Sequence, residues 1–134
     1  MVGVRFDNGE RVIERWDEAF KAVSAEPRRQ LLVSLLDAEP TDSVPLPEAA
    51  INPNVPVEPE RLRTELFHAH LPMLARLEFV EWERDPLRAS RGPRFEEVAV
   101  VFESLHAMSD QVPDSLVIGC QRLEAERQDV HSDG

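Results

Sequence analysis

Two adjacent stretches decide the fold of this 134-residue chain: Leu66-Phe67-His68-Ala69-His70-Leu71-Pro72-Met73-Leu74 and Phe79-Val80-Glu81-Trp82-Glu83. The first stretch repeats leucine at helical spacing and, with its flanks, predicts a helix from about Pro59 to Leu77. Pro72 falls inside this helix and is expected to kink it or to remove one hydrogen bond. The second stretch alternates apolar and polar residues, which predicts a strand. A helix followed at once by a strand is therefore the organising feature of the chain.

The flanking sequence predicts more helices and few strands. Apolar residues at helical spacing indicate helices at about 10–23, 27–37, 94–108 and 113–127, after a short β-like start at residues 1–9 and with a turn-rich loop at 85–93. At most one short helix, at 47–51, is expected between residues 38 and 60, and the remainder of that segment should be a surface loop. The reason is that this segment holds six of the eleven prolines, namely Pro40, Pro45, Pro47, Pro53, Pro56 and Pro59.

The charge of the chain is unusual in both sign and composition. The net charge is -11, acidic residues are spread from Asp7 to Asp133, and every basic residue except Lys21 is arginine. A dispersed acidic surface with almost no lysine is typical of extreme halophiles, because hydrated carboxylates keep a protein soluble where salt screens charge. An acidic mesophilic protein is the alternative. The sequence shows neither a membrane-spanning apolar run nor a signal-peptide pattern, so a cytoplasmic location is expected.

Two stretches carry a resemblance to a known family. Ser24-Ala25-Glu26-Pro27-Arg28-Arg29-Gln30-Leu31-Leu32 has a small residue, a proline, two arginines and an apolar run in that family's order. The stretch 66–74, followed by 79–82, is similar to its recognition helix and first wing strand. On these residues the chain resembles winged-helix domains of the ArsR-like repressor superfamily, and most closely a group of haloarchaeal, hence archaeal, domains. It departs from them at Glu78, where glycine is usual, and in the long proline-rich linker from Asp37 to Pro59.

The resemblance implies a fold that is mainly α with a small β wing, a winged helix-turn-helix with additional C-terminal helices. The expected organisation is an N-terminal extension at 1–14, the winged-helix domain at 15–106, and a C-terminal helix with a frayed tail at 107–134. The implied function is a DNA-binding transcriptional regulator that acts as a homodimer in a high-salt cytoplasm. The alternative is a degenerate winged helix that binds proteins and has lost DNA binding.

A DNA-contacting set follows from this architecture, because one helix of such domains enters the major groove and the wing touches the backbone. Residues 84–94 contain four arginines and one acid, a balance of +3, whereas residues 59–95 carry +1 and the rest of the chain -12. An anionic duplex is therefore tolerated best at the wing. Ordinary solvated arginines, or partners of nearby glutamates, are the alternative. The predicted set is Arg61, Thr64, Glu65 and His68 on the helix and Arg84, Arg88, Arg91 and Arg94 in the wing.

The last two helices carry more apolar surface than one core needs, which predicts a homodimer whose two-fold symmetry would match a palindromic site. The alternative is that both helices close the core of a monomer. The predicted interface residues are Val98, Val101, Leu105, Met108, Leu116, Cys120 and Leu123.

No catalytic site, metal or cofactor is predicted. His68 and His70 lie two residues apart, so on a helix they point to different sides and cannot jointly bind one ion; His68 should be exposed and His70 packed near the core. Cys120 is the only cysteine, which excludes an internal disulfide and favours a buried structural thiol over a redox sensor. The chain has no glycine-rich phosphate loop, nucleophile elbow or histidine–carboxylate motif, so an enzyme is not expected.

Overall fold

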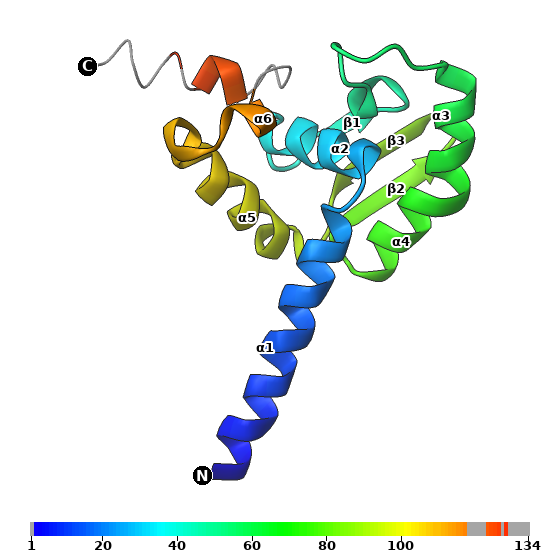
Figure 1. Ribbon diagram of the computed structural model, residues 1–134. Coiled ribbons are helices and arrows are strands. Elements are labelled where there is room, and N and C mark those ends of the chain that lie inside the picture. Colours follow the sequence, from blue (N-terminus) through cyan, green and yellow to red (C-terminus); the bar gives the residue numbers. More distant parts are fainter. Residues whose placement is uncertain (1, 118–122, 127, 129–134) are drawn as a thin grey trace.

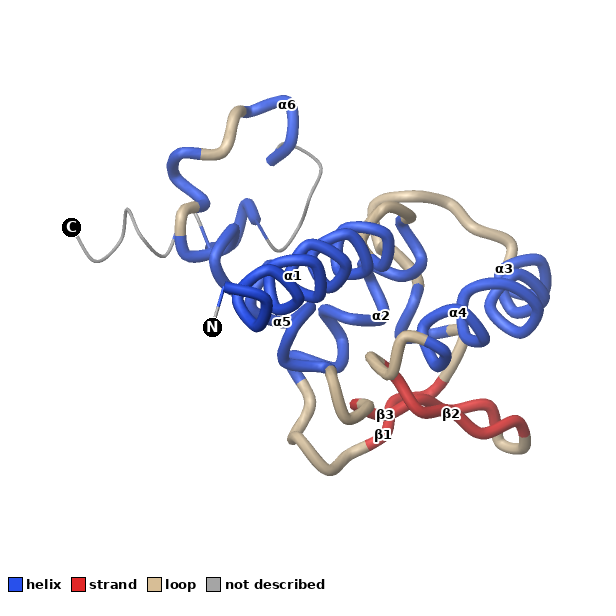
Figure 2. The backbone as a smooth tube through the Cα atoms, turned by 90° about the horizontal axis from the view of Figure 1, so that it is seen from below, coloured by secondary structure: helices blue, strands red, loops and turns tan. Residues whose placement is uncertain are grey.

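The computed structural model of the chain describes residues 2–117, 123–126 and 128 (Figure 1). Helices make up most of it, and a small three-stranded antiparallel sheet and loops make up the rest. The predicted class, mainly α with a small β element, is therefore confirmed. Figure 2 shows the strands gathered on one side of the helices, with the β2–β3 hairpin beside α3 and α4.

The first element, α1 (Val2–Ala22), is one continuous helix whose N-terminal end projects away from the rest of the molecule (Figure 1). The β-like start predicted for residues 1–9 is wrong, because a glycine inside a helix costs only about 1 kcal/mol and Gly9 does not end this one. The last turns pack on the core, where Ala19 and Ala22 are 2% and 0% exposed. This helix also runs through the expected boundary at residue 14.

The central helix is α2 (Glu26–Asp37), whose Leu31, Leu32 and Leu35 are fully buried. Pro27 occupies its first turn, where a missing N–H removes no helical hydrogen bond. After α2 the chain forms β1 (Ser43–Pro45) and the 3-10 turn η1 (Glu48–Ala50). The turn lies within the short helix expected at 47–51, and the hydroxyl of Ser34 holds it against α2 by donating to the carbonyl of Ala49 at 2.7 Å.

A buried arginine joins α1 to α2. Arg28 is 8% exposed, and its Nε donates to the carbonyl of Ala22 at 3.0 Å. Its Nη2 donates to the carbonyl of Lys21 at 3.1 Å and to Oγ of Ser24 at 2.9 Å. These carbonyls belong to the C-terminal end of α1, where unpaired acceptors and the helix dipole both favour a cation. Arg28 therefore fixes the corner between the two helices.

The helix predicted from Pro59 to Leu77 is present in three parts: α3 (Pro59–Glu65), the π-helical η2 (Leu66–His70) and α4 (Leu71–Arg76). The disturbance predicted at Pro72 takes the form of this π turn, in which the N–H of Leu71 bonds the carbonyl of Leu66, five residues back. Proline has no N–H, and its ring would clash with a carbonyl four residues earlier in a regular helix. The wider turn accommodates the ring without ending the helix.

The helix ends in a turn that aims the chain into the sheet. Glu78 has φ of 65°. Its N–H donates to the carbonyl of Ala75, and the N–H of Phe79 donates to that of Leu74, which is the Schellman pattern. Gly92 packs against this turn so closely that a Cβ there would lie 2.5 Å from the carbonyl oxygen of Glu78. The left-handed turn and the glycine together fix the angle between α4 and the hairpin.

The sheet has the strand order β1-β3-β2, with both neighbouring pairs antiparallel. The predicted strand is confirmed as β2 (Val80–Arg84). The loop expected at 85–93 is wrong in part, because β3 (Leu87–Arg91) pairs with both other strands, and β1 was also not predicted. Val80, Leu87 and Ala89 are buried on the face that meets the helices.

The chain then returns to the helical side as α5 (Phe95–Ala107), followed by η3 (Ser109–Gln111) and α6 (Asp114–Val117). α5 packs against α1 and α2. α6 starts where the last helix was predicted, and residues 118–122 and 127 of that prediction lie outside the described residues. No helix in the described ranges is both long and apolar enough to cross a membrane.

The turn at Glu78 generates a stability prediction. Glu78→Gly is expected to raise the free energy of unfolding by about 0.5–1 kcal/mol, because left-handed backbone costs an L-residue more than glycine loses in entropy. Gly92→Ala is expected to lower it by about 1–3 kcal/mol, since the new methyl group meets backbone atoms that cannot move aside. Urea unfolding at fixed salt measures both changes. A neutral or destabilising Glu78→Gly contradicts this explanation of the turn.

Candidate nucleic-acid interface

Arg84 forms a cluster with two aromatic rings where the hairpin meets the helix. Its guanidinium carbon lies 4.9 Å from the ring centroid of Phe67, in η2, and 5.7 Å from that of Trp82, in β2. The two rings meet edge to face with centroids 5.5 Å apart. Within the described part of the chain, Arg84 makes neither a hydrogen bond nor an ion pair. The rings therefore orient a cation whose N–H donors remain available to an external anion.

Exposed residues of the helix extend this cluster. Arg63 lies one turn before Phe67 and so shares its side of the helix. Thr64 and His68 occupy the adjacent side, and the His68 ring meets the Phe67 ring at 5.2 Å. The cluster and these three residues form what we call the helix–hairpin surface: Arg63, Thr64, Phe67, His68, Trp82 and Arg84. This surface contains two arginines and no carboxylate.

The other two predicted helix residues are paired with each other. Arg61 Nε lies 3.3 Å from Glu65 Oε1 in an exposed ion pair one turn apart. Both residues line a cavity on the side of α3 that faces α2, so they flank the helix–hairpin surface. The structure thus brings His68 against the Phe67 ring that Arg84 also contacts, and it pairs Arg61 with Glu65.

Arg91 caps a helix. Its Nε and Nη2 donate to the carbonyl of Leu35 at 3.1 and 2.9 Å, and Nη2 also donates to the carbonyls of Leu36 and Ala38. These carbonyls end α2 and have no acceptor role left within the helix. The guanidinium lies over the ring of Phe95 as well, at 4.8 Å. The predicted phosphate contact by Arg91 is therefore corrected to a structural role.

Arg94 is held between α1 and α5. It pairs with Glu18 at 2.9 Å and with Glu97 at 3.0 Å, and it lies over the Phe79 ring at 5.3 Å. Hydrogen bonds with Glu97 and Glu18 raise the pKa of Arg94, and the bond from Arg94 lowers the pKa of Glu97. The predicted DNA contact by Arg94 is likewise corrected, because its donors are used inside the domain.

Arg88 joins two strands on the outer face of the sheet. Its Nε donates to Oγ of Ser43 at 2.7 Å, and its Nη2 donates to the carbonyl of Ser43 at 2.9 Å. Its cross-strand partner in β2 is Glu83. Three of the four arginines at 84–94 therefore make internal bonds, and the sequence could not reveal this because the acceptors of Arg88 and Arg91 lie 45 to 56 residues away. Arg84 is therefore the one arginine of residues 84–94 for which the described part of the chain supplies neither a hydrogen bond nor an ion pair.

His70 faces the interior, as predicted, and His68 is exposed. Nδ1 of His70 lies 2.9 Å from Nη1 of Arg28. Because a guanidinium only donates, His70 must accept at Nδ1 and carry its proton at Nε2. Burial, and then the charge of Arg28, lower the pKa of His70. The π turn of the candidate helix is thus tied to the α1–α2 corner.

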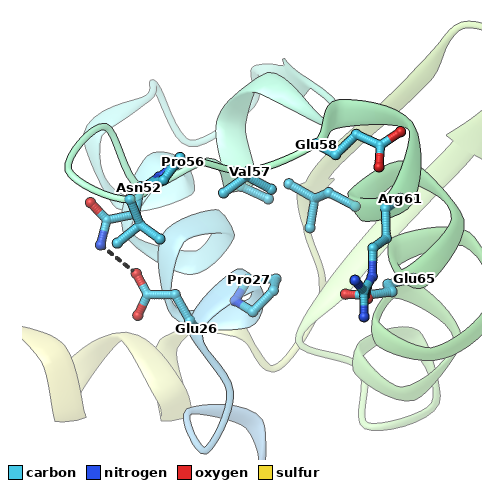
Figure 3. Close-up of a pocket in the computed structure, with 11 residues that line it drawn as sticks. Glu26, Pro27, Asn52, Pro56, Val57, Glu58, Arg61 and Glu65 are labelled. Atoms are coloured by element: carbon cyan, nitrogen blue, oxygen red, sulfur yellow. Dashed lines mark hydrogen bonds and ion pairs between the residues drawn. The ribbon is translucent and has the colours of Figure 1, made fainter.

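A cavity of about 320 Å³ lies between the N-terminus of α2, the proline-rich loop and α3 (Figure 3). Glu26 on its wall accepts hydrogen bonds from Gln30 at 2.9 Å and from Asn52 at 2.8 Å. Burial alone would raise the pKa of Glu26, but bonds from Gln30, Asn52 and Arg29 hold it below the ordinary value. Arg61, the cation among the described lining residues, is paired with Glu65. The wall therefore offers no free cation to an anionic ligand.

The residues predicted to form a dimer interface are dispersed. Val98 is 0% exposed in the domain's own core, which excludes it from a surface. Leu105, Met108 and Leu116 are 54%, 48% and 66% exposed, whereas Val101 and Leu123 are partly buried. Cys120 lies outside the described residues. Among the residues that are described, no three histidine, cysteine or acidic side chains gather as a metal site would require.

No protein-family model, curated protein sequence or solved structure matches this chain. The class of protein must therefore be argued from the topology and from the side chains of the helix–hairpin surface.

His70 generates a prediction about pH. Well above pH 6.5, the ordinary pKa of histidine, the imidazole is neutral in both the folded and the unfolded state and adds nothing to the pH dependence. Below that value the unfolded chain takes up a proton that the folded chain resists, so stability falls until the pH passes the lower, folded pKa. His70→Asn keeps an acceptor for Arg28 and should remove this loss in the range above carboxylate titration.

Thermal unfolding measured from pH 7.5 downward compares the wild type with His70→Asn. The matched control is His68→Asn, which changes an exposed histidine and should keep the wild-type pH dependence. Equal pH dependence of the wild type and His70→Asn contradicts the assigned role of His70.

Proposed function

We propose that the chain is a winged-helix protein that binds double-stranded DNA and regulates transcription. The observation that supports the proposal is the helix–hairpin surface, where Arg84 of the hairpin lies over Phe67 and the exposed Arg63, Thr64 and His68 flank Phe67 on the helix. In this class a helix reads base edges in the major groove while the hairpin contacts the backbone.

The order of elements supports the class. A helix (α2), a strand (β1), a long helix (α3–η2–α4) and a hairpin (β2–β3) follow one another, and the first strand pairs with the last. The departure is the helix that would precede the recognition helix, which is reduced here to the single turn η1. The hydrogen bond from Ser34 to the carbonyl of Ala49 holds η1 against α2. Residues of α2, η1 and α3 line one cavity, so the proposed recognition helix still lies beside a fixed segment.

The chemistry of the surface suits a high-salt cell. At molar salt, release of counterions adds little affinity, so base and shape contacts must supply more of it. His68 can donate to and accept from base edges, and Thr64, whose hydroxyl donates to the carbonyl of Glu60, can accept. Arg84 is held in position by Phe67 and Trp82 before DNA arrives. This arrangement depends on preorganisation more than on net positive charge.

A second function is favoured by a specific observation. Arg88, Arg91 and Arg94 make internal bonds, which leaves far less basic surface than the sequence indicates. The same cluster of two half-buried aromatic rings and an exposed arginine is also a common composition for a protein interface. A winged helix that binds a protein partner in place of DNA is therefore the rival function.

Selection from a randomised duplex library in molar potassium chloride separates the two functions. We expect an enriched motif that the wild type binds and that Arg84→Glu binds about 10- to 100-fold more weakly, as for loss of a positioned arginine contact. Arg11→Glu is the matched control, because it makes the same charge change on exposed α1 and should leave binding unchanged. Fluorescence anisotropy measures the affinities.

Two outcomes contradict the DNA function. The first is that no motif is enriched by the wild type, which leaves the protein-binding rival. The second is that Arg84→Glu and Arg11→Glu weaken binding equally, since that result reports net charge and not a site.

A further inference from the structure

Carboxylates border the helix–hairpin surface. Glu60 lies one turn before Thr64 on the exposed side of α3, and the Thr64 hydroxyl donates to the Glu60 carbonyl at 3.0 Å. Glu83 and Asp85 flank Arg84 in the chain and are exposed at the tip of the β2–β3 hairpin. Within the described residues, none of these three carboxylates makes a hydrogen bond or an ion pair. The surface proposed to meet DNA therefore has free negative charges at its edge.

The segments that form this surface have no positive charge balance. Residues 59–70 contain two arginines and two glutamates, and residues 83–86 contain one arginine and two acids, which gives -1 for the two segments together. Because Arg61 is paired with Glu65, the two remaining arginines of these segments stand against the three free carboxylates. The whole chain carries -11, so the rest of it carries -10 and adds repulsion at longer range.

Salt acts differently on the attraction and on the repulsion. An arginine that binds a phosphate is only about 3 Å from it, so few ions can come between the two charges. Carboxylates at the border lie further from the phosphates, where ions screen them. The Debye length falls from about 10 Å at 0.1 M salt to about 3 Å at 1 M salt. A rise in salt therefore removes more of the repulsion than of the attraction.

We propose that duplex binding at the helix–hairpin surface takes up potassium ions, so that its affinity rises with salt. The inference rests on the proposed DNA function and adds its regulation by salt. Most DNA-binding proteins release cations, because their arginines and lysines replace the ions along the phosphates. Here cations gather between the phosphates and Glu60, Glu83 and Asp85 in the complex. Uptake at three carboxylates outweighs release by two arginines.

These charges give the expected slope of log affinity against log salt. Two arginine–phosphate contacts alone give about -1.8, at roughly 0.9 per phosphate, so affinity would fall about 60-fold for a tenfold rise in salt. Uptake at three carboxylates, taken at the same roughly 0.9 per charge, adds about +2.7. The expected slope is therefore about +0.9, a gain of roughly 8-fold in affinity for a tenfold rise in salt.

Fluorescence anisotropy with the selected duplex measures this slope on the full chain, from about 0.3 to 3 M potassium chloride. The wild type should bind more tightly as salt rises. Glu60→Gln with Asp85→Asn removes two border carboxylates at nearly unchanged size, and its slope should be about -0.9. Circular dichroism restricts the comparison to salt concentrations at which both proteins have their full helical signal, so that folding does not contribute to the slope.

The matched control is Glu14→Gln with Asp17→Asn, which removes two carboxylates from exposed α1 and should keep the wild-type slope. Potassium glutamate in place of potassium chloride changes only the anion and should keep it as well. A wild-type slope near about -1.8 overturns the proposal. A slope that follows the anion, or one that is unchanged in the Glu60→Gln, Asp85→Asn variant, also overturns it.

These failures are distinguishable from failure of the DNA function. A duplex that is bound selectively, but more weakly as salt rises, leaves the DNA function standing and overturns the uptake of cations alone. Failure of the wild type to bind any duplex at every salt concentration overturns both.

Discussion

The guanidinium of Arg28 is the interaction on which the rest of the structure depends. It bonds the last carbonyls of α1, a hydroxyl in the α1–α2 connection, and the imidazole of His70 in the π turn. Its partners are all neutral, so a buried cation is solvated by helix carbonyls and by a histidine that must remain uncharged. The C-terminal end of α1, the corner before α2 and the π turn of the candidate recognition helix are thus joined by one side chain.

The sequence predicted those elements whose formation depends mainly on residues close together in the chain. The helix at 59–76, the strand at 80–84 and the effect of Pro72 follow from spacing and from the covalent structure of proline. The strands β1 and β3 did not, because short segments of mixed polarity become strands only by pairing with one another. Glu78 holds the left-handed position in which glycine is usual because the Schellman bonds and the contact with Gly92 specify it.

The candidate site was predicted in part, and the error lay in treating arginines as equivalent. Sequence shows that residues 84, 88, 91 and 94 are all arginine, but it does not show that Ser43 of β1, the end of α2 and two glutamates take three of them. Phe67 and Trp82 appeared only as pattern residues, although they position the arginine that remains free. In a chain with a net charge of -11, the proposed function therefore rests on one oriented cation and its neighbours on the helix.

The central claim is that Arg84 is free to bind DNA while other arginines are held inside the domain. NMR of the arginine side-chain Nε–H groups, recorded with and without the selected duplex, tests it most directly. We expect the signals of Arg28, Arg91 and Arg94 to be protected from exchange in the free protein and to stay in place when DNA is added. The signal of Arg84 should exchange rapidly in the free protein, then shift and become protected in the complex. Shifts of Arg91 and Arg94 on DNA, with Arg84 unchanged, would contradict the account.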